Sequence, residues 1–139
     1  MRKAWLVLAA VAFVLPAGCN KRRGSPTAPP PPATPRTVTV RMTVPNVFAP
    51  KDTTVARGDT VLWINDGPMQ HTTTSGPCPP CNGDGLWNSG LMPAGAMFRV
   101  VFGPGTDQPG LVHVDSVGPV PYFCIPHAPG MSGSITVTP

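Results

Sequence analysis

The sequence has no segment with the periodicity of an amphipathic helix, and it contains 21 prolines and 15 glycines. Both residue types interrupt helices, so a helical domain is excluded. Only 12% of the residues are charged, and residues 37–139 contain no basic cluster, which indicates that this part does not bind nucleic acid. The apolar run at residues 4–15 is too short for a permanent membrane-spanning helix, which needs about 20 apolar residues.

The N-terminus has the pattern of a secretory signal peptide, with Met1-Arg2-Lys3 preceding the apolar run. The run ends in Leu-Pro-Ala-Gly-Cys at residues 15–19, which resembles the lipobox of bacterial lipoproteins. The resemblance implies that residues 1–18 are removed and that Cys19 is acylated; ordinary signal cleavage nearby is the alternative. We therefore expect an exported protein, periplasmic or at the cell surface, that is attached to the membrane through its lipid.

Residues 19–36 are expected to be a proline-rich basic tether behind the lipidated cysteine. Residues 24–35 are rich in Pro, Ser, Thr and Ala, a composition that buries little surface and favours an extended polyproline-like chain. Residues 20–36 have four basic and no acidic side chains, whereas residues 37–139 have four basic and six acidic ones. Each basic residue near the membrane surface contributes about 1 kcal/mol of attraction to anionic headgroups.

Alternation of apolar and polar residues begins at residue 37 and is typical of half-buried β-strands. We expect strands at residues 37–44, 53–55, 60–65, 97–102, 111–114, 120–124 and 134–138, and a loop or short strand at 87–95. Short strands at this spacing predict an all-β sandwich or barrel, one domain over residues 37–139. The alternation places Trp63 and Phe102 in the core, while Trp87 packs in the core or a loop.

The segment Tyr-Phe-Cys-Ile-Pro-His-Ala-Pro-Gly-Met-Ser-Gly, residues 122–133, contains a thiol, an imidazole and a thioether. Soft and borderline donors of this kind select copper over magnesium, calcium or manganese. Cys124, His127 and Met131 are therefore candidate ligands, and His71 is the candidate for a second imidazole. The alternative is an inert buried thiol, a surface histidine and a methionine that fills the core. The close spacing of all three donors before a strand favours the metal site.

These residues resemble the plastocyanin-like cupredoxins in order over nearly all of residues 37–139. The matching segments are residues 48–50 and 55–65 for the early strands, 71–74 around the first histidine, 87–92 and 95–98 for the middle hairpin, and 122–133 for the ligand loop. The resemblance implies two Greek-key sheets and one type 1 copper ion near one end. It also implies His71, Cys124 and His127 as strong ligands, Met131 as a weak axial ligand, and electron transfer between redox partners.

We therefore expect a monomeric electron carrier that meets its redox partner proteins transiently. A multicopper oxidase needs further copper clusters rich in histidine, and the chain has three histidines. A copper storage or delivery protein with the same ligands and a metal-free adhesive β-sandwich are the alternatives. The electron carrier would be distinguished from both by a reversible copper chromophore.

The resemblance also implies that the ring edge of His127 reaches the surface inside an apolar rim used for docking. The residues that we expect in this rim are Pro68, Met69, Ala128 and Pro129, with Met92 as a further candidate. Alternatively, these are ordinary loop residues with no role in docking. We expect Met69, Met92 and Met97 to be packing or rim residues rather than axial donors.

Cys78 and Cys81 have the spacing of a redox motif, Cys-Pro-Pro-Cys. A thioredoxin-like site needs this motif beside a βαβ unit, and a zinc site needs a second ligand pair; the sequence shows neither. We expect a local disulfide that braces the loop after His71, and a second metal site or a catalytic thiol pair are the alternatives. His113 is expected to be an ordinary residue of a short strand or loop.

Overall fold

A computed structural model describes residues 34–139 of the chain. The expectations for the signal peptide, for Cys19 and for residues 19–33 of the tether lie outside these residues. The strands are β1 (Thr37–Thr43), β2 (Val47–Ala49), β3 (Asp52–Ala56), β4 (Thr60–Asn65), β5 (Thr74–Ser75), β6 (Met97–Val101), β7 (Val112–His113), β8 (Gly118–Phe123) and β9 (Ser132–Thr138), with one 3₁₀ turn, η1 (Ile125–His127). Within residues 34–139 there is no helix with the length and apolarity that a membrane span requires.

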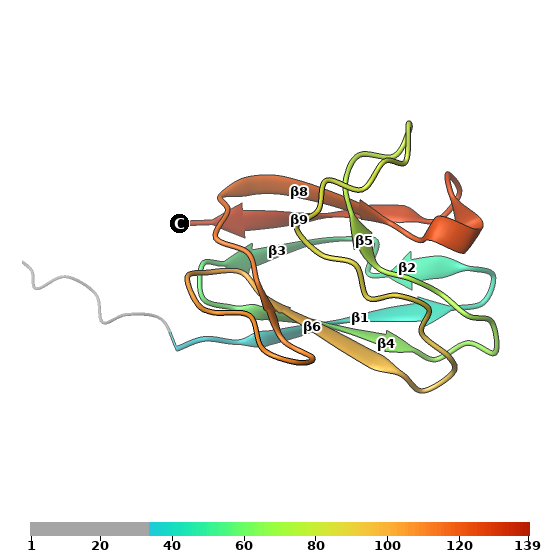
Figure 1. Ribbon diagram of the computed structural model, residues 1–139, viewed down its shortest axis with the longest axis horizontal. Coiled ribbons are helices and arrows are strands. Elements are labelled where there is room, and N and C mark those ends of the chain that lie inside the picture. Colours follow the sequence, from blue (N-terminus) through green and yellow to red (C-terminus); the bar gives the residue numbers. More distant parts are fainter. Residues whose placement is uncertain (1–33) are drawn as a thin grey trace, which may run out of the picture. The chain divides into compact units, whose positions relative to one another are not determined.

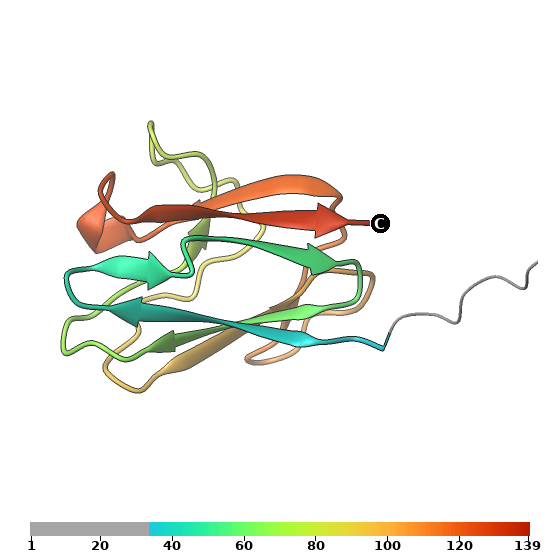
Figure 2. The same ribbon diagram turned by 180° about the vertical axis from the view of Figure 1, so that it is seen from behind.

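The strands form two sheets that lie face to face (Figure 1; Figure 2 from behind). One sheet has the order β2-β1-β4-β6-β7, and the other has the order β3-β9-β8-β5. β1 and β4 are parallel, as are β3 and β9, whereas β4 pairs antiparallel with β6 and β8 with β9. The predicted all-β sandwich is confirmed.

The strand predictions agree with the structure wherever alternation is long enough to detect. β4 has the predicted bounds, Thr60–Asn65, and its burial alternates strictly between half-buried and buried residues. Two strands were not predicted: β2 has 3 residues and β5 has 2. Strands of that length contain too little alternation to distinguish them from a loop. Residues 87–95 form a loop with isolated β-bridges rather than a strand.

Aromatic side chains from both sheets and from the 87–95 loop meet in the core. The ring of Trp63 lies 5.5 Å from that of Tyr122 and 5.7 Å from that of Trp87, and Phe102 packs edge-on against Trp87 at 5.9 Å. All four side chains are buried, as predicted for Trp63 and Phe102. Aromatic rings bury about 150–250 Å² each, so this cluster supplies much of the apolar area that stabilises the sandwich.

A buried carboxylate fixes the start of the domain. Asp59 accepts hydrogen bonds from the backbone N–H groups of Arg36 (2.8 Å) and Ala56 (2.9 Å) and from the Arg36 guanidinium (3.0 Å). The carbonyl of Arg36 in turn accepts the N–H of Thr60 at 2.8 Å. Arg36, which the sequence placed in the tether, is therefore held by the folded domain.

Candidate metal centre

Three of the predicted ligands come from the loop between β8 and β9, at one end of the sandwich (Figure 1). The two strands are antiparallel, and three backbone hydrogen bonds shape the loop between them. The N–H of Cys124 donates to the carbonyl of Met131 (2.9 Å), that of His127 to the carbonyl of Cys124 (3.2 Å), and that of Met131 to the carbonyl of His127 (3.1 Å). Pro126 lies in the first turn of η1 and stiffens it. The backbone thus sets the spacing of the three residues before any metal binds.

His71 reaches the same place from the segment between β4 and β5. Its backbone forms an isolated antiparallel bridge with Met92, with N···O distances of 3.2 and 2.8 Å. Thr74 of β5 then pairs with Phe123 of β8, directly before Cys124. These two pairings bring His71 to Cys124 although 53 residues separate them in sequence.

The donor atoms of His71, Cys124 and His127 converge in the arrangement that a single soft ion requires. The Cys124 Sγ lies 3.6 Å from the Nδ1 of His71 and 3.3 Å from the Nδ1 of His127. All three donor atoms lie within 4.8 Å of one another, and the two imidazole rings are 4.7 Å apart. One thiolate and two imidazoles are the set that copper prefers, so these residues fit a copper ion.

Burial sets the protonation of these groups. Burial, with a smaller contribution from the neighbouring His127, lowers the pKa of His71, so its imidazole is neutral and able to bind a metal. Burial raises the pKa of the Cys124 thiol, against opposing hydrogen bonds from Thr72 and His127. A buried thiolate therefore needs a nearby positive charge, and a metal ion held between the three donors would supply it.

Thr72, which sequence reasoning did not identify, supports the sulfur directly. Its backbone N–H donates to the Cys124 Sγ at 3.3 Å, and its Oγ1 accepts the N–H of Ile125 at 2.8 Å. The same residue therefore stabilises negative charge on the sulfur and connects the His71 segment to the ligand loop. The only sequence feature that could have indicated this role is the position of Thr72 directly after the candidate ligand His71.

Asn65, at the end of β4, holds the segments around His71 in place. Its side-chain amide is buried and donates to the carbonyls of Met69 and Met92, each at 2.8 Å, while its Oδ1 accepts the N–H of Gly67 at 3.0 Å. One side chain thereby satisfies three backbone groups on both sides of the ligand, which fixes the approach of His71.

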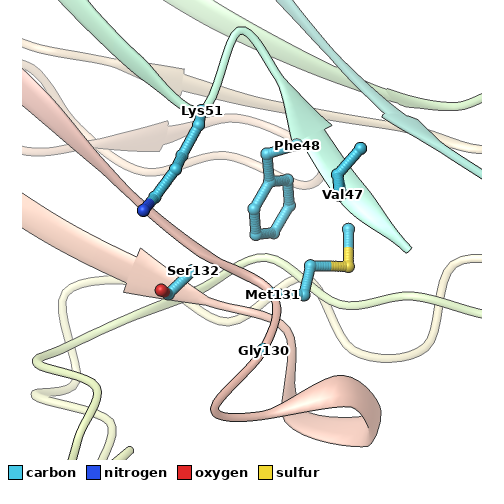
Figure 3. A pocket seen from close by; sticks show the side chains of 6 residues that line it. All are labelled: Val47, Phe48, Lys51, Gly130, Met131 and Ser132. Atoms are coloured by element: carbon cyan, nitrogen blue, oxygen red, sulfur yellow. The ribbon is translucent and has the colours of Figure 1, made fainter. Parts of the chain in front are cut away.

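Met131 lies at the end of the ligand loop, and its side chain is 1% exposed. It lines a small pocket of about 230 Å³ together with Val47, Phe48, Lys51, Gly130 and Ser132. Figure 3 shows its thioether beside Val47 and Phe48. The backbone hydrogen bonds of the short loop keep Met131 next to Cys124 and His127. The axial role of its thioether stays a prediction.

The four predicted ligand residues differ in exposure. His71, Cys124 and Met131 are buried, whereas His127 is half-buried. Of the predicted rim residues, Pro68, Met69 and Pro129 are exposed and Ala128 is half-buried. Met92 is 3% exposed, so of its two expected roles, packing or rim, it has the packing role: its backbone pairs with His71 inside the domain. Ile125, in the ligand loop, and Leu91, beside Met92, are exposed apolar residues that the prediction missed.

The sequence offered five further possible ligands: Cys78, Cys81, Met69, Met97 and His113. Cys78 and Cys81 form a disulfide, and neither belongs to the group of possible metal ligands found in residues 34–139. Met69 and Met97 are 53% and 60% exposed. His113 lies in β7 with its Nδ1 3.8 Å from the carboxylate of Asp107, in keeping with an ordinary strand residue.

The fold and the site together define a two-sheet β-protein with one mononuclear soft-metal centre at the end of the sandwich. The family model described as copper binding proteins, plastocyanin/azurin family, matches residues 37–138. The chain belongs to this family, and its cofactor is copper. Comparison with curated protein sequences finds no match.

Solved structures of other proteins share this two-sheet fold. A novel purple cupredoxin from Nitrosopumilus maritimus is 21% identical with a TM-score of 0.57, covering 72% of this chain and 98% of the other. A mutant of amicyanin in the reduced Cu(I) form at pH 4 is 22% identical, with a TM-score of 0.54 and coverage of 73% and 82%. A copper-containing nitrite reductase from Thermus scotoductus is 24% identical with a TM-score of 0.55, covering 76% of this chain but 23% of that enzyme.

Proposed function

We propose that the domain is a monomeric carrier of single electrons between redox partner proteins, and not an enzyme. The observation that supports this most directly is the arrangement of the donors: Cys124 and His71 are buried and preorganised by the backbone, while His127 reaches towards solvent. Bound copper would supply a one-electron couple between Cu(I) and Cu(II). The chain's own contribution is to hold the donors in one geometry for both oxidation states, which keeps reorganisation small.

The rim around His127 supports a transient docking surface for these partners. The side chains of Pro68, Met69 and Pro129 are exposed, and Ile125 in the ligand loop is 51% exposed. An apolar contact excludes water from the electron's path, and redox encounters use small interfaces that dissociate quickly. We therefore propose that electrons enter and leave through the imidazole edge of His127.

Adding Cu(II) to the purified protein tests the proposal. We expect an intense visible band from the thiolate–copper bond, which bleaches with ascorbate and returns on oxidation through many cycles. A colourless product that releases Cu(I) to a mild chelator would favour copper storage or delivery instead. Absence of binding would favour a metal-free adhesive domain.

Replacing Met131 by leucine should leave copper bound and raise the reduction potential. Leucine is close to methionine in volume, so the buried site accepts it, but a weak donor to Cu(II) is lost. Each tenfold loss of Cu(II) affinity relative to Cu(I) raises a one-electron potential by about 59 mV. Protein-film voltammetry measures the shift. The exposed Met97→Leu change is the matched control, and an unchanged potential in Met131→Leu would indicate another axial group.

We also propose that the domain acts outside the cytoplasm as a membrane-anchored lipoprotein. The Cys78–Cys81 disulfide supports this, since disulfides persist in oxidising compartments. The signal-like N-terminus and the cysteine at position 19 agree with it. Mass spectrometry of the mature N-terminus tests the proposal, and an unmodified cysteine or an uncleaved leader would contradict it.

A further inference from the structure

The loop that follows β5 contains a feature that the copper centre does not use. Residues 76–84 project away from the sheets, as the yellow-green loop at the top of Figure 1 and of Figure 2 shows. Cys78 and Cys81 lie within this loop and are joined by a disulfide that spans a sequence separation of 3. The bridge therefore joins two residues of one loop and does not link one strand to another.

The base of the loop is closed by other interactions. The N–H of Asp84 donates to the carbonyl of Ser75 at 3.0 Å, and the Ser75 hydroxyl donates to the Asp84 carboxylate. The N–H of Gly76 donates to the carbonyl of Pro121 in β8 at 2.9 Å. Gly76 has φ +136°, and a Cβ at this residue would lie 2.1 Å from the carbonyl oxygen of Asn82. The two sides of the loop therefore meet through their backbones, independently of the disulfide.

The disulfide lies in a partly exposed segment and adds little to stability. The loop that it closes is among the shortest that a disulfide can close. The bridge therefore removes little conformational entropy from the unfolded chain, and its contribution to stability is small. Cys78 and Cys81 are half-buried, and their neighbours Pro77, Pro79 and Pro80 are exposed. Cys81 has φ +63°, a left-handed conformation that disfavours a side chain, so opening the bridge would allow it to relax.

We propose that Cys78–Cys81 is a second redox site, which exchanges two electrons with the dithiol of an exported thiol–disulfide oxidoreductase. A thiolate of the donor attacks one sulfur of the bridge, forming a mixed disulfide and releasing the other cysteine as a thiolate that takes up a proton. The donor's second thiolate then attacks the mixed disulfide and frees the first cysteine. The net change is one protein disulfide and one dithiol converted to one protein dithiol and one disulfide of the donor.

The exchange is confined to this loop. Cys124 is the one free cysteine within residues 34–139, and it is fully buried, so it does not compete as an attacking thiol. The closed base of the loop should also keep β5 paired with β8 when the bridge opens. We therefore expect reduction of the loop to leave the copper ligands in place.

Labelling of thiols in the full-length copper-loaded protein tests the proposal. The protein is incubated in mixtures of reduced and oxidised dithiothreitol, quenched with acid, alkylated and digested with trypsin. Cleavage after Arg57, Arg99 and other basic residues places Cys78 and Cys81 on the peptide 58–99 and Cys124 on the peptide 100–139. We expect two labels on the first peptide while the near-ultraviolet circular dichroism of the tryptophans stays native, and loss of both labels on reoxidation.

The rate of reduction provides the decisive number. We expect the rate of reduction in the folded protein to be within about tenfold of the rate in urea. Unfolding would do little to increase the access of a reductant to a disulfide that it can already reach in the folded protein. Labels that appear only as the domain unfolds would overturn the proposal. The double variant Cys78→Ser/Cys81→Ser is the matched control, expected to take no label on peptide 58–99 and to keep the visible copper band. Loss of that band in the double variant would also overturn the proposal, because it would make the bridge a structural support of the copper site.

Discussion

Replacing Cys124 by serine is expected to abolish the intense visible absorption of the copper-loaded protein. An alcohol does not ionise at neutral pH as a metal-bound thiol does, so the charged sulfur that produces the band is lost. The imidazoles of His71 and His127 remain and should retain copper weakly, with a spectrum typical of nitrogen and oxygen ligands. Optical titration with Cu(II) and electron paramagnetic resonance measure both effects.

The expected loss is specific to this sulfur. Far-ultraviolet circular dichroism of Cys124→Ser should be that of the parent, since the backbone hydrogen bonds from Cys124 to Met131 and from His127 to Cys124 do not involve the side chain. A Cys124→Ser protein that keeps the visible band would exclude this thiol as a ligand and with it the proposed electron carrier.

Replacing Asp59 by asparagine should destabilise the domain by about 3 kcal/mol at neutral pH. The carboxylate is 2% exposed and accepts two backbone N–H groups and a guanidinium N–H. An amide accepts through one oxygen only and points its own NH₂ group at one of these donors. Urea unfolding followed by tryptophan fluorescence measures the loss. Asp66→Asn is the matched control, because Asp66 also pairs with an arginine, Arg41, but on the surface, where such pairs contribute about 0–1 kcal/mol.

The loss of stability caused by Asp59→Asn should depend on pH in a defined direction. Burial by itself would raise the pKa of Asp59, but hydrogen bonds from Arg36 and Ala56 lower it below the ordinary value. A group with a lowered pKa in the folded state contributes stability above its unfolded pKa of about 3.9 and loses it as the pH falls towards the folded value. The difference between parent and Asp59→Asn should therefore be largest at neutral pH and shrink below about pH 4. A difference that is constant with pH would assign the effect to packing instead.

The parts of the fold that sequence predicted are those that depend on local pattern. Alternation in β4 places Val61 and Trp63 on the core side, and the structure buries both completely. The ligand loop was predictable for the same reason, since Cys124, His127 and Met131 lie within one short hairpin connection. In both cases the residues are close in sequence, so their separation along the chain determines how they are placed in the fold.

The contacts that sequence did not predict depend on register between distant segments. The support of Cys124 Sγ by the N–H of Thr72 requires β5 to pair with β8, and a strand of 2 residues has no detectable pattern. The burial of Met92 follows from its bridge to His71, which lies in a different segment on the other side of β5. Such pairings are set by the whole sandwich, and a single sequence contains no local signal for them.

The unequal exposure of the ligands has a kinetic consequence if the domain shuttles electrons as proposed. His127 is half-buried and the other three ligand residues are buried, so reduction and oxidation would use the same small area of surface. Donor and acceptor would then compete for one footprint, and the carrier would have to leave one before it meets the other. Turnover in a reconstituted chain should obey ping-pong kinetics and slow when either partner is in excess.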